Sequence, residues 1–206
     1  VYDLLTGDAV LGEVWHQVNE KLAVAPSHID LAAAEVELAG VVGRELILRD
    51  KLASVTDQFD YVLIDCPPSL GLVTLNVLTA ADAVIIPIQC EYYALEGISQ
   101  LLNTIRVVQQ NFNPDFQIEG VLLTMYDNRL NLSKQVVTEA KEYFGAKVFR
   151  TVIPRNVRLA EAPSFGKPIL LYDVQSIGAK SYLAVAQELM KRTVGLTKGR
   201  SGGGAT

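Results

Sequence analysis

The sequence predicts an α/β fold: a mostly parallel sheet with helices packed on both of its faces. Short apolar runs of strand length alternate along the chain with longer stretches that have helical periodicity, which is the order typical of parallel sheets. Residues 61–65 and 83–90 are apolar almost throughout, as expected of strands that are buried on both faces.

The predicted strands are apolar runs, and prolines end the first two. Pro26 ends the first run, and Pro67 and Pro68 follow the second, since proline has no backbone N–H to donate to a sheet. The predicted strands cover residues 21–27, 61–65, 83–90, 118–126 and 147–154.

The predicted helices are marked by composition, capping residues and apolar periodicity. Residues 29–38 are rich in alanine, and Ser69 is a suitable N-cap for the helix that follows it. Apolar residues recur on one helical face between Ile98 and Phe112, and Gly145 is a suitable end for the next helix. The predicted helices cover residues 29–38, 43–55, 69–81, 98–112, 132–145 and 178–194.

The composition is that of a soluble globular protein. Half of the 206 residues are hydrophobic and 20% are charged, and no apolar run approaches the ~18 residues needed to cross a bilayer. We therefore expect a cytoplasmic protein without a membrane partner, with one domain over residues 1–194 and a flexible, small and polar tail over residues 195–206. Cys66 and Cys90 are too few for a disulfide framework or a metal site, so we expect both to be packing residues.

The charge is distributed unevenly along the chain. The net charge is −5, but residues 128–168 contain eight basic and three acidic side chains, which gives +5 there and leaves −10 for the rest. A basic sector in an acidic protein indicates a localised anionic partner, although a solvated helix face is the simpler interpretation of charge alone. The basic residues are Arg129, Lys134, Lys141, Lys147, Arg150, Arg155, Arg158 and Lys167.

One predicted strand delivers a carboxylate in a pattern typical of nucleotide-hydrolysing proteins. The segment "DYVLIDCPPS", residues 60–69, is an apolar run that ends in Asp65 and is stopped by two prolines. Such an aspartate binds and orients a magnesium ion beside the phosphates. The simpler interpretation is an aspartate that caps the next helix.

The same chemistry needs a glycine-rich loop that ends in Lys-Ser/Thr and surrounds the phosphates. No G-x-x-x-x-G-K-[ST] occurs in the sequence, and the glycines of "GRSGGGAT" follow a predicted helix rather than a strand. Two interpretations stay open at this point: the segment at 60–69 is a false match, or the sequence lacks the part of the protein that carries the loop.

Ligands of parallel sheets bind at the carboxyl ends of the strands. The polar and special residues that follow the predicted strands should therefore share one edge of the sheet. They are Asp65, Cys66, Gln89, Glu91, Tyr126, Asp127, Pro154 and Arg155.

Four segments resemble, in this order, the ParA/Soj partitioning ATPases: "LIDCPPSLG", "IQCEYYALEGISQLL", "LLTMYDNR" and "TVIPRNVRLAEAPSFGKPI". This family belongs to the deviant Walker A group of P-loop NTPases, in the MinD/ParA superfamily. The resemblance extends from Val1 to about Met190. It implies a P-loop NTPase fold whose N-terminal strand or strands and Walker A phosphate loop are missing from this sequence and would lie upstream of Val1. This chain by itself is therefore not expected to hydrolyse ATP.

The resemblance implies an ATPase that acts in chromosome or plasmid partitioning. Such proteins bind ATP and Mg²⁺, form a homodimer when ATP is bound, coat nucleoid DNA without sequence preference, and release it when a ParB-type partner stimulates hydrolysis. Two alternatives stay open: a non-catalytic DNA- or partner-binding module that has lost the phosphate loop, and a ParA relative that positions another cargo.

The resemblance also implies roles for individual residues at the nucleotide. Asp65 would be the catalytic Walker B carboxylate, which holds Mg²⁺ through a water molecule, and Pro67, with Pro68 and Ser69, would belong to the switch that senses the γ-phosphate. An aspartate can accept a hydrogen bond from the adenine amino group, and a proline ring can pack on the base. The adenine pocket would be formed by Tyr126, Asp127, Pro154, Arg155 and Asn156, each of which could also be an ordinary turn residue.

Arg129 and Arg158 match the positions that carry DNA-binding arginines in Soj-like proteins. Both lie in the basic segment, and the planar fork of arginine suits phosphate. No helix-turn-helix or zinc-finger motif accompanies them, so the contacts should be with backbone phosphates and independent of DNA sequence. A salt-bridged surface arginine is the alternative interpretation of either residue alone.

Overall fold

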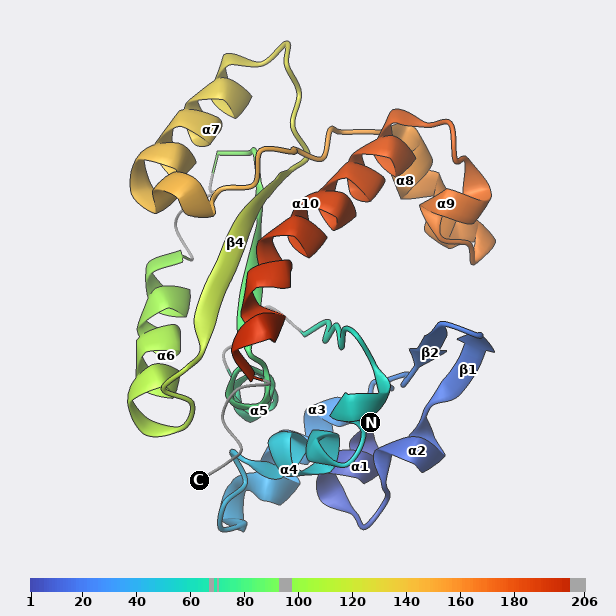
Figure 1. Cartoon of the computed structure of the whole chain (residues 1–206), viewed down its shortest axis with the longest axis vertical. Coiled ribbons are helices and arrows are strands. Elements are labelled where there is room, and N and C mark those ends of the chain that lie inside the picture. Colours follow the sequence, from blue (N-terminus) through green and yellow to red (C-terminus); the bar gives the residue numbers. More distant parts are fainter. Residues whose placement is uncertain (67–68, 70, 93–97, 201–206) are drawn as a thin grey trace. The chain divides into compact units, whose positions relative to one another are not determined.

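The computed structural model describes residues 1–66, 69, 71–92 and 98–200, with side chains as far as Thr193. The chain forms two compact units (Figure 1). The first comprises Val1–Val84 and Ile98–Gln117, and the second comprises Ile85–Gly97 and Ile118–Thr206.

The first unit is mainly helical and carries a small antiparallel hairpin. Its elements are α1 (Tyr2–Thr6), α2 (Leu11–Val14), β1 (His16–Asn19), β2 (Leu22–Val24), α3 (Leu31–Glu37), η1 (Leu38–Gly40), α4 (Ile47–Ala53), η2 (Thr56–Gln58), α5 (Leu72–Ala80) and α6 (Ile98–Asn111). The predicted strand at 21–27 is therefore shorter than expected and belongs to the β1–β2 hairpin, not to a parallel sheet. Most of its residues are exposed, whereas parallel strands are buried on both faces.

A buried asparagine connects the helices of the first unit. Asn76, on α5, is fully buried, and its Oδ1 accepts the backbone N–H of Leu48 at 3.1 Å. Its amide group donates to the carbonyl oxygens of Arg44 at 2.8 Å and Leu72 at 3.1 Å. All of its polar atoms are satisfied, so α5 is fixed against the start of α4 within a core of leucine, valine and alanine.

Residues 61–66 do not form the predicted buried strand. The segment has no regular secondary structure, and Val62 and Leu63 are 44% and 81% exposed. A strand needs hydrogen bonds to a neighbouring strand and cover on its faces. In the part of the chain that the structure describes, no strand pairs with this segment, so its apolar run lies in an irregular, largely exposed stretch.

The predicted N-cap of α5 is also wrong. The helix begins at Leu72 with Gly71 as its N-cap, and no side chain of the capping residue bonds to the helix. The carboxylate of Glu35, on α3, accepts the backbone N–H of Val73 at 3.4 Å instead. A Cβ at Gly71 would meet that carboxylate, so a larger residue here would require the Glu35 side chain to move. Ser69 lies two residues too early to cap the helix.

The second unit contains the parallel sheet that the sequence predicts. Its elements are β3 (Ala83–Gln89), β4 (Gln117–Thr124), α7 (Asn131–Phe144), η3 (Gly145–Lys147), α8 (Val157–Glu161), η4 (Ala162–Phe165), α9 (Ile169–Tyr172) and α10 (Ile177–Arg200), with the first residues of both strands assigned to the first unit. β3 and β4 are neighbours. The N–H of Gln117 donates to Asp82 near their beginnings and the N–H of Cys90 donates to Thr124 near their ends, so they run in the same direction.

Residues 148–154 lie along the other edge of β4 but do not form a complete strand. Isolated parallel bridges pair Val121 with Val148 and Tyr126 with Pro154. Between these bridges the backbone N–H groups of Arg150 and Thr151 donate to the carboxylate of Glu188 at 2.8 and 3.0 Å. The predicted strand at 147–154 is thus parallel to β4, but two of its backbone N–H groups bond to the side chain of Glu188 instead of to a neighbouring strand.

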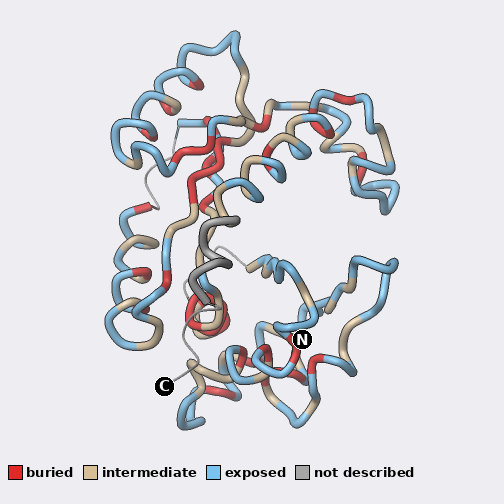
Figure 2. The backbone as a smooth tube through the Cα atoms, in the orientation of Figure 1, coloured by how far each residue is buried: buried red, intermediate tan, exposed pale blue. Residues whose placement is uncertain are grey.

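Helices cover both faces of this sheet, as predicted: α7 and α10 lie on opposite sides of β4 (Figure 1). Val185 of α10 packs on Leu122, Phe149 and Ile153, and the buried residues of the second unit are concentrated along β4 (Figure 2). Gly145 ends α7 with a φ of 56°, a conformation that favours glycine. The last helix continues to Arg200, beyond residue 194, where the sequence predicted its end.

Candidate functional site

A pocket of about 430 Å³ lies at the carboxyl ends of β4 and of residues 148–154. This is the edge at which parallel sheets bind their ligands. Four of the five residues that were predicted to form the adenine pocket line it, namely Tyr126, Asp127, Pro154 and Arg155. The fifth, Asn156, does not. The remaining lining residues are Asn128, Arg129, Val152, Ile177 and Ser181.

Backbone hydrogen bonds bring the two halves of the pocket together. The N–H of Tyr126 donates to Ile153 at 3.1 Å, and the N–H of Arg155 donates to Tyr126 at 2.9 Å. Met125, just before this point, has a φ of 54°, a conformation that costs a non-glycine residue on the order of 1–3 kcal/mol. The chain therefore turns sharply from β4 into the pocket wall, where such strain is commonly found.

A buried serine holds the loop that carries Asp127. The backbone N–H of Asp127 donates to the hydroxyl of Ser133 at 3.4 Å, and that hydroxyl donates to the carbonyl oxygen of Cys90 at 3.4 Å. Ser133 is fully buried on α7 and shares its inner face with Val136 and Ala140. Sequence reasoning missed this residue, although a serine in register with the apolar face of a predicted helix is a signal for it.

Asp127 and Arg129 form a tight ion pair at the mouth of the pocket. One carboxylate oxygen of Asp127 accepts the backbone N–H of Arg129 at 3.0 Å and its Nε at 2.9 Å, and the other accepts Nη2 at 2.6 Å. The hydrogen bonds from Arg129, with a smaller effect of Arg155, lower the pKa of Asp127 from 3.8 to about 2. The pocket therefore contains a fixed negative charge at neutral pH.

Arg155 is held by a second carboxylate. Its Nη2 lies 2.6 Å from Oε1 of Glu91, which follows the end of β3. Glu91, Tyr126, Asp127, Pro154 and Arg155 thus gather at one edge of the sheet in the second unit, as the sequence predicts. Asn156 begins α8 as its N-cap without a side-chain capping bond, and its buried Oδ1 has no hydrogen-bond partner among the described residues.

Asp65 belongs to the first unit, where it is exposed in the irregular segment 61–66. Pro67 and Pro68 lie outside the described residues, and Ser69 is exposed. No group of three or more metal-ligating side chains occurs within the described residues. A single carboxylate fits Mg²⁺ nonetheless, since this ion keeps several waters and commonly binds one or two carboxylates plus substrate phosphates. The catalytic and metal-binding roles of Asp65 stay predictions.

The two candidate DNA-binding arginines are both exposed and both paired. The side chain of Arg129 is 82% exposed, although Asp127 holds its inner edge. That of Arg158 is 54% exposed; its Nη1 lies 2.9 Å from Glu161 and its Nε 3.5 Å from Asp173. Both side chains are therefore accessible to a phosphate that approaches from the solvent.

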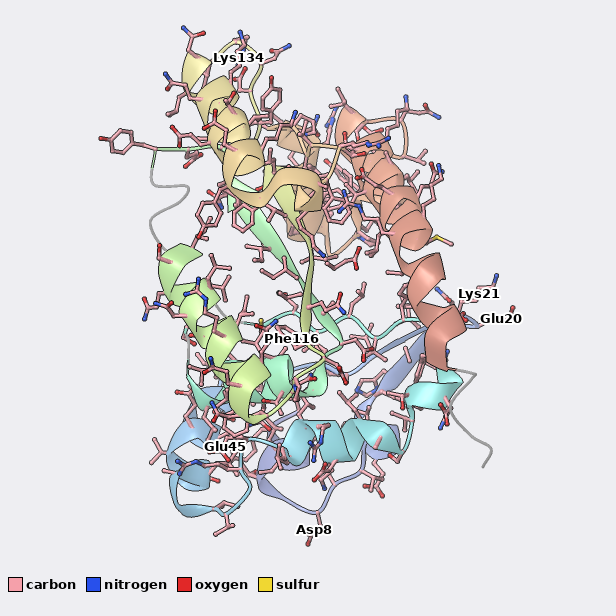
Figure 3. All side chains as sticks on the ribbon, turned by 60° about the vertical axis from the view of Figure 1, so that its left-hand side comes forward. Asp8, Glu20, Lys21, Glu45, Phe116 and Lys134 are labelled. Atoms are coloured by element: carbon pink, nitrogen blue, oxygen red, sulfur yellow. The ribbon has the colours of Figure 1, made fainter. Side chains whose placement is uncertain are left out.

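Other cations of the basic segment carry no ion pair within the described side chains. Lys134 projects from α7 into solvent (Figure 3). The members of this group are Lys134, Lys141, Lys147, Arg150 and Lys167.

The cysteines are packing residues, as predicted. Cys90 is buried at the end of β3, and burial raises the pKa of its thiol from 9.0 to about 11. Cys66 packs against the core of the first unit, and burial also raises its pKa. Both thiols are therefore protonated at neutral pH and are poor nucleophiles.

Comparisons with known proteins agree on one family. The profile of the AAA domain family matches residues 1–118. The chain is 58% identical over 190 residues to the sporulation initiation inhibitor protein Soj of Bacillus subtilis, and the match covers 92% of this chain and 75% of that protein. It is 55% identical over 193 residues to the chromosome partitioning protein ParA of Myxococcus xanthus, and that match covers 93% of this chain and 68% of the relative.

A solved structure gives the same fold. Cobyrinic acid a,c-diamide synthase from Mycobacterium smegmatis is 38% identical and superimposes with a TM-score of 0.78 over 92% of this chain and 71% of that chain. Its structure with bound ADP and magnesium has a TM-score of 0.70 over 81% and 73%. Among the described helices of the present chain, none is both long and apolar enough to cross a membrane.

Proposed function

The chain belongs to the ParA/Soj family of chromosome-partitioning proteins, and we propose that it is the main body of an ATPase that partitions chromosomes or plasmids. The observation that carries this proposal is the pocket at the end of β4, which Tyr126, Asp127, Pro154 and Arg155 line together. These residues were selected from strand ends and motif resemblance alone, and they lie at the edge where this class of sheet binds ligands.

The chemistry of the pocket is compatible with adenine. The carboxylate of Asp127 is an acceptor that stays ionised at neutral pH, so it suits the amino group at position 6 of adenine. Tyr126 and Pro154, paired by a bridge, provide ring surfaces on which a base can pack.

Asp65 is the proposed carboxylate for magnesium. When bound, the ion would neutralise developing charge on the phosphates, and Asp65 would orient it by accepting hydrogen bonds from its water ligands. The proposal also requires a glycine-rich phosphate loop, which the 206 residues do not contain. The structure of a 38% identical protein with ADP and magnesium supports nucleotide and Mg²⁺ as the cofactors of this fold.

Arg129 and Arg158 are the proposed contacts to double-stranded DNA. Both are exposed arginines of the basic segment, and contacts to backbone phosphates would make binding independent of sequence. On this proposal the protein is cytoplasmic and associated with the nucleoid. It forms a homodimer with bound ATP, and a ParB-type partner stimulates hydrolysis and releases the protein from DNA.

The other candidate function is a non-catalytic module that binds DNA or a protein partner. The two candidates are separated by the coding sequence upstream of Val1. An in-frame K-G-G-x-G-K-[ST] there supports the ATPase, and its absence supports the module.

Hydrolysis provides the biochemical test. ATP turnover is measured for the protein with a phosphate-loop segment placed ahead of Val1, with and without Mg²⁺ and duplex DNA. We expect Mg²⁺-dependent turnover that Asp65→Ala removes without altering the circular dichroism spectrum. Asp60→Ala is the matched control, because Asp60 is an exposed aspartate close by in the same stretch, and it should leave turnover unchanged. Normal turnover in Asp65→Ala would contradict the proposed role of Asp65.

A further inference from the structure

Glu91 lies beside the pocket at the end of β4 but does not line it. Its carboxylate instead holds Arg155, which does line the pocket, and the distance between Oε1 of Glu91 and Nη2 of Arg155 is 2.6 Å. Glu91 is therefore one residue removed from any ligand of the pocket, and the proposed function assigns it no role.

The backbone on each side of this ion pair is anchored to β4 or to the residues just after it. The N–H of Cys90, next to Glu91, donates to the carbonyl oxygen of Thr124 at 2.9 Å. On the other side, the N–H of Arg155 donates to the carbonyl oxygen of Tyr126 at 2.9 Å. The carboxylate and the guanidinium thus extend from two fixed backbones, and their contact orders the side chains themselves.

The charges of the pocket lining leave Arg155 as the cation for a ligand. The lining contains one carboxylate and two guanidinium groups, those of Asp127, Arg129 and Arg155. Asp127 and Arg129 bind each other through three hydrogen bonds, so their charges largely cancel. A ligand that carries an anionic group next to its base matches the charge that remains.

The guanidinium of Arg155 has donors that its ion pair does not use. An arginine side chain carries five N–H donors in a planar fork, and within the described residues the side-chain hydrogen bond of Arg155 involves Nη2. A carboxylate that holds Nη2 restricts the orientation of the fork. Nε and Nη1 then stay available for a phosphate, which arginine commonly binds through two parallel hydrogen bonds.

We propose that Glu91 is a positioning residue, which holds Arg155 in the orientation that binds the phosphate of an adenine nucleotide. This inference rests on the proposed function. The physical basis is preorganisation, because a long side chain that is ordered before the ligand arrives loses less conformational freedom on binding. The negative charge of Glu91 acts in the opposite direction on a phosphate, but its side chain is 51% exposed, so solvent and salt screen that repulsion.

Two substitutions separate the positioning effect from the charge effect. Glu91→Gln and Glu91→Ala remove the same charge, but only glutamine keeps an oxygen that can accept the hydrogen bond from Nη2. AMP should therefore bind to Glu91→Ala about two- to tenfold more weakly than to Glu91→Gln, the range expected when the ligand has to order one long side chain. Adenosine, which has no phosphate, should bind equally to both variants. Isothermal titration calorimetry of the 206-residue chain measures these affinities.

Arg155→Ala shows whether Glu91 acts through the arginine. Wild type should bind AMP more tightly than adenosine, and Arg155→Ala should remove this preference. When Arg155→Ala is combined with Glu91→Gln or with Glu91→Ala, the two double variants should bind AMP equally, because no guanidinium remains to be positioned.

Glu161→Ala is the matched control. Glu161 also holds a half-exposed arginine of the second unit, Arg158, at 2.9 Å, and neither of these residues lines the pocket. Its loss should leave the affinities for AMP and adenosine as in wild type.

Two results would overturn the inference while the proposed function stands. One is equal binding of AMP to Glu91→Gln and Glu91→Ala. The other is a loss of adenosine affinity in Glu91→Ala as large as the loss of AMP affinity, which would show that Glu91 supports the pocket as a whole. If the wild-type chain binds neither AMP nor adenosine, the inference and the proposed function both fail.

Discussion

Glu91 and Arg155 form an ion pair of 2.6 Å across the end of β4. Glu91 follows β3, Arg155 follows residues 148–154, and Tyr126 lies between them because β4 is the strand that both neighbours share. The pair therefore links the segments that follow two strand neighbours of β4, and its arginine lines the pocket.

The first prediction concerns the stability that this pair contributes. Both side chains are about half exposed, so Glu91→Gln should change the free energy of unfolding by less than about 1 kcal/mol. Urea unfolding of the variant and wild type measures the difference. A loss of several kcal/mol would show that the pair supports the sheet rather than only orienting Arg155.

The second prediction concerns Arg192, which ties α10 to the sheet. Its guanidinium donates to the carbonyl oxygens of Glu119, Lys147 and Val148 and to Glu188, and it stacks on the ring of Phe149 at 4.2 Å. Arg192→Ala should lower the free energy of unfolding by about 2–3 kcal/mol, because several carbonyls lose a charged donor.

Arg106→Ala is the matched control for Arg192→Ala. Arg106 is exposed on α6 and donates one hydrogen bond, to Asn103, so its loss should cost less than about 0.5 kcal/mol. Equal losses for the two variants in urea unfolding would contradict the role of Arg192.

The third prediction is a pH dependence at Glu188. Burial by itself raises the pKa of this carboxyl, but hydrogen bonds from the N–H groups of Arg150 and Thr151 and from Arg192 lower it overall from its ordinary 4.5. A carboxyl whose folded pKa is depressed stabilises the protein above its unfolded pKa, and this stability is lost as the pH falls through the folded value.

Glu188→Gln removes this contribution. The variant should be less stable than wild type at neutral pH, and the difference should shrink as the pH falls below 4.5. Unfolding in urea over an acid series checks this, and a difference that stays constant down to low pH would show that Glu188 stabilises the fold in some other way.

The fourth prediction concerns DNA. If Arg129 and Arg158 contact phosphates, replacing either with alanine should weaken binding to any duplex sequence by a similar factor. The slope of log K against log salt should flatten by about 0.9 for each lost contact. A salt titration of duplex binding measures both effects, and loss of binding to only one DNA sequence would contradict sequence-independent contact.

Elements were predicted well where a clear sequence pattern coincides with a neighbouring element to pack or pair against. β3, β4, α6 and α7 fall where apolar runs and periodicity placed them, and residues after the ends of parallel strands meet in the pocket. The run at 61–65 has the same local signal, but in the described residues no neighbouring strand pairs with it, so the signal did not produce a strand.

Other features depend on contacts that sequence spacing does not encode. Glu35 caps α5 from a different helix, and Ser133 supports Asp127 across a turn. The Asp127–Arg129 pair arises because the loop folds back on itself after Met125. Two residues separated by one position do not face each other on a helix, and residues 127–129 follow the end of β4 rather than lying in a strand, so the helix and strand periods do not predict this contact.

The location of the adenine site is the central claim, and photoaffinity labelling tests it most directly. The protein is irradiated with 8-azido-ATP and digested with trypsin, and the labelled peptides are identified by mass spectrometry. We predict labelling of residues 107–129, which contain Tyr126 and Asp127, or of residues 151–155, which contain Pro154 and Arg155. Competition by unmodified ATP should remove the label. Labelling confined to residues 1–84 would contradict the account.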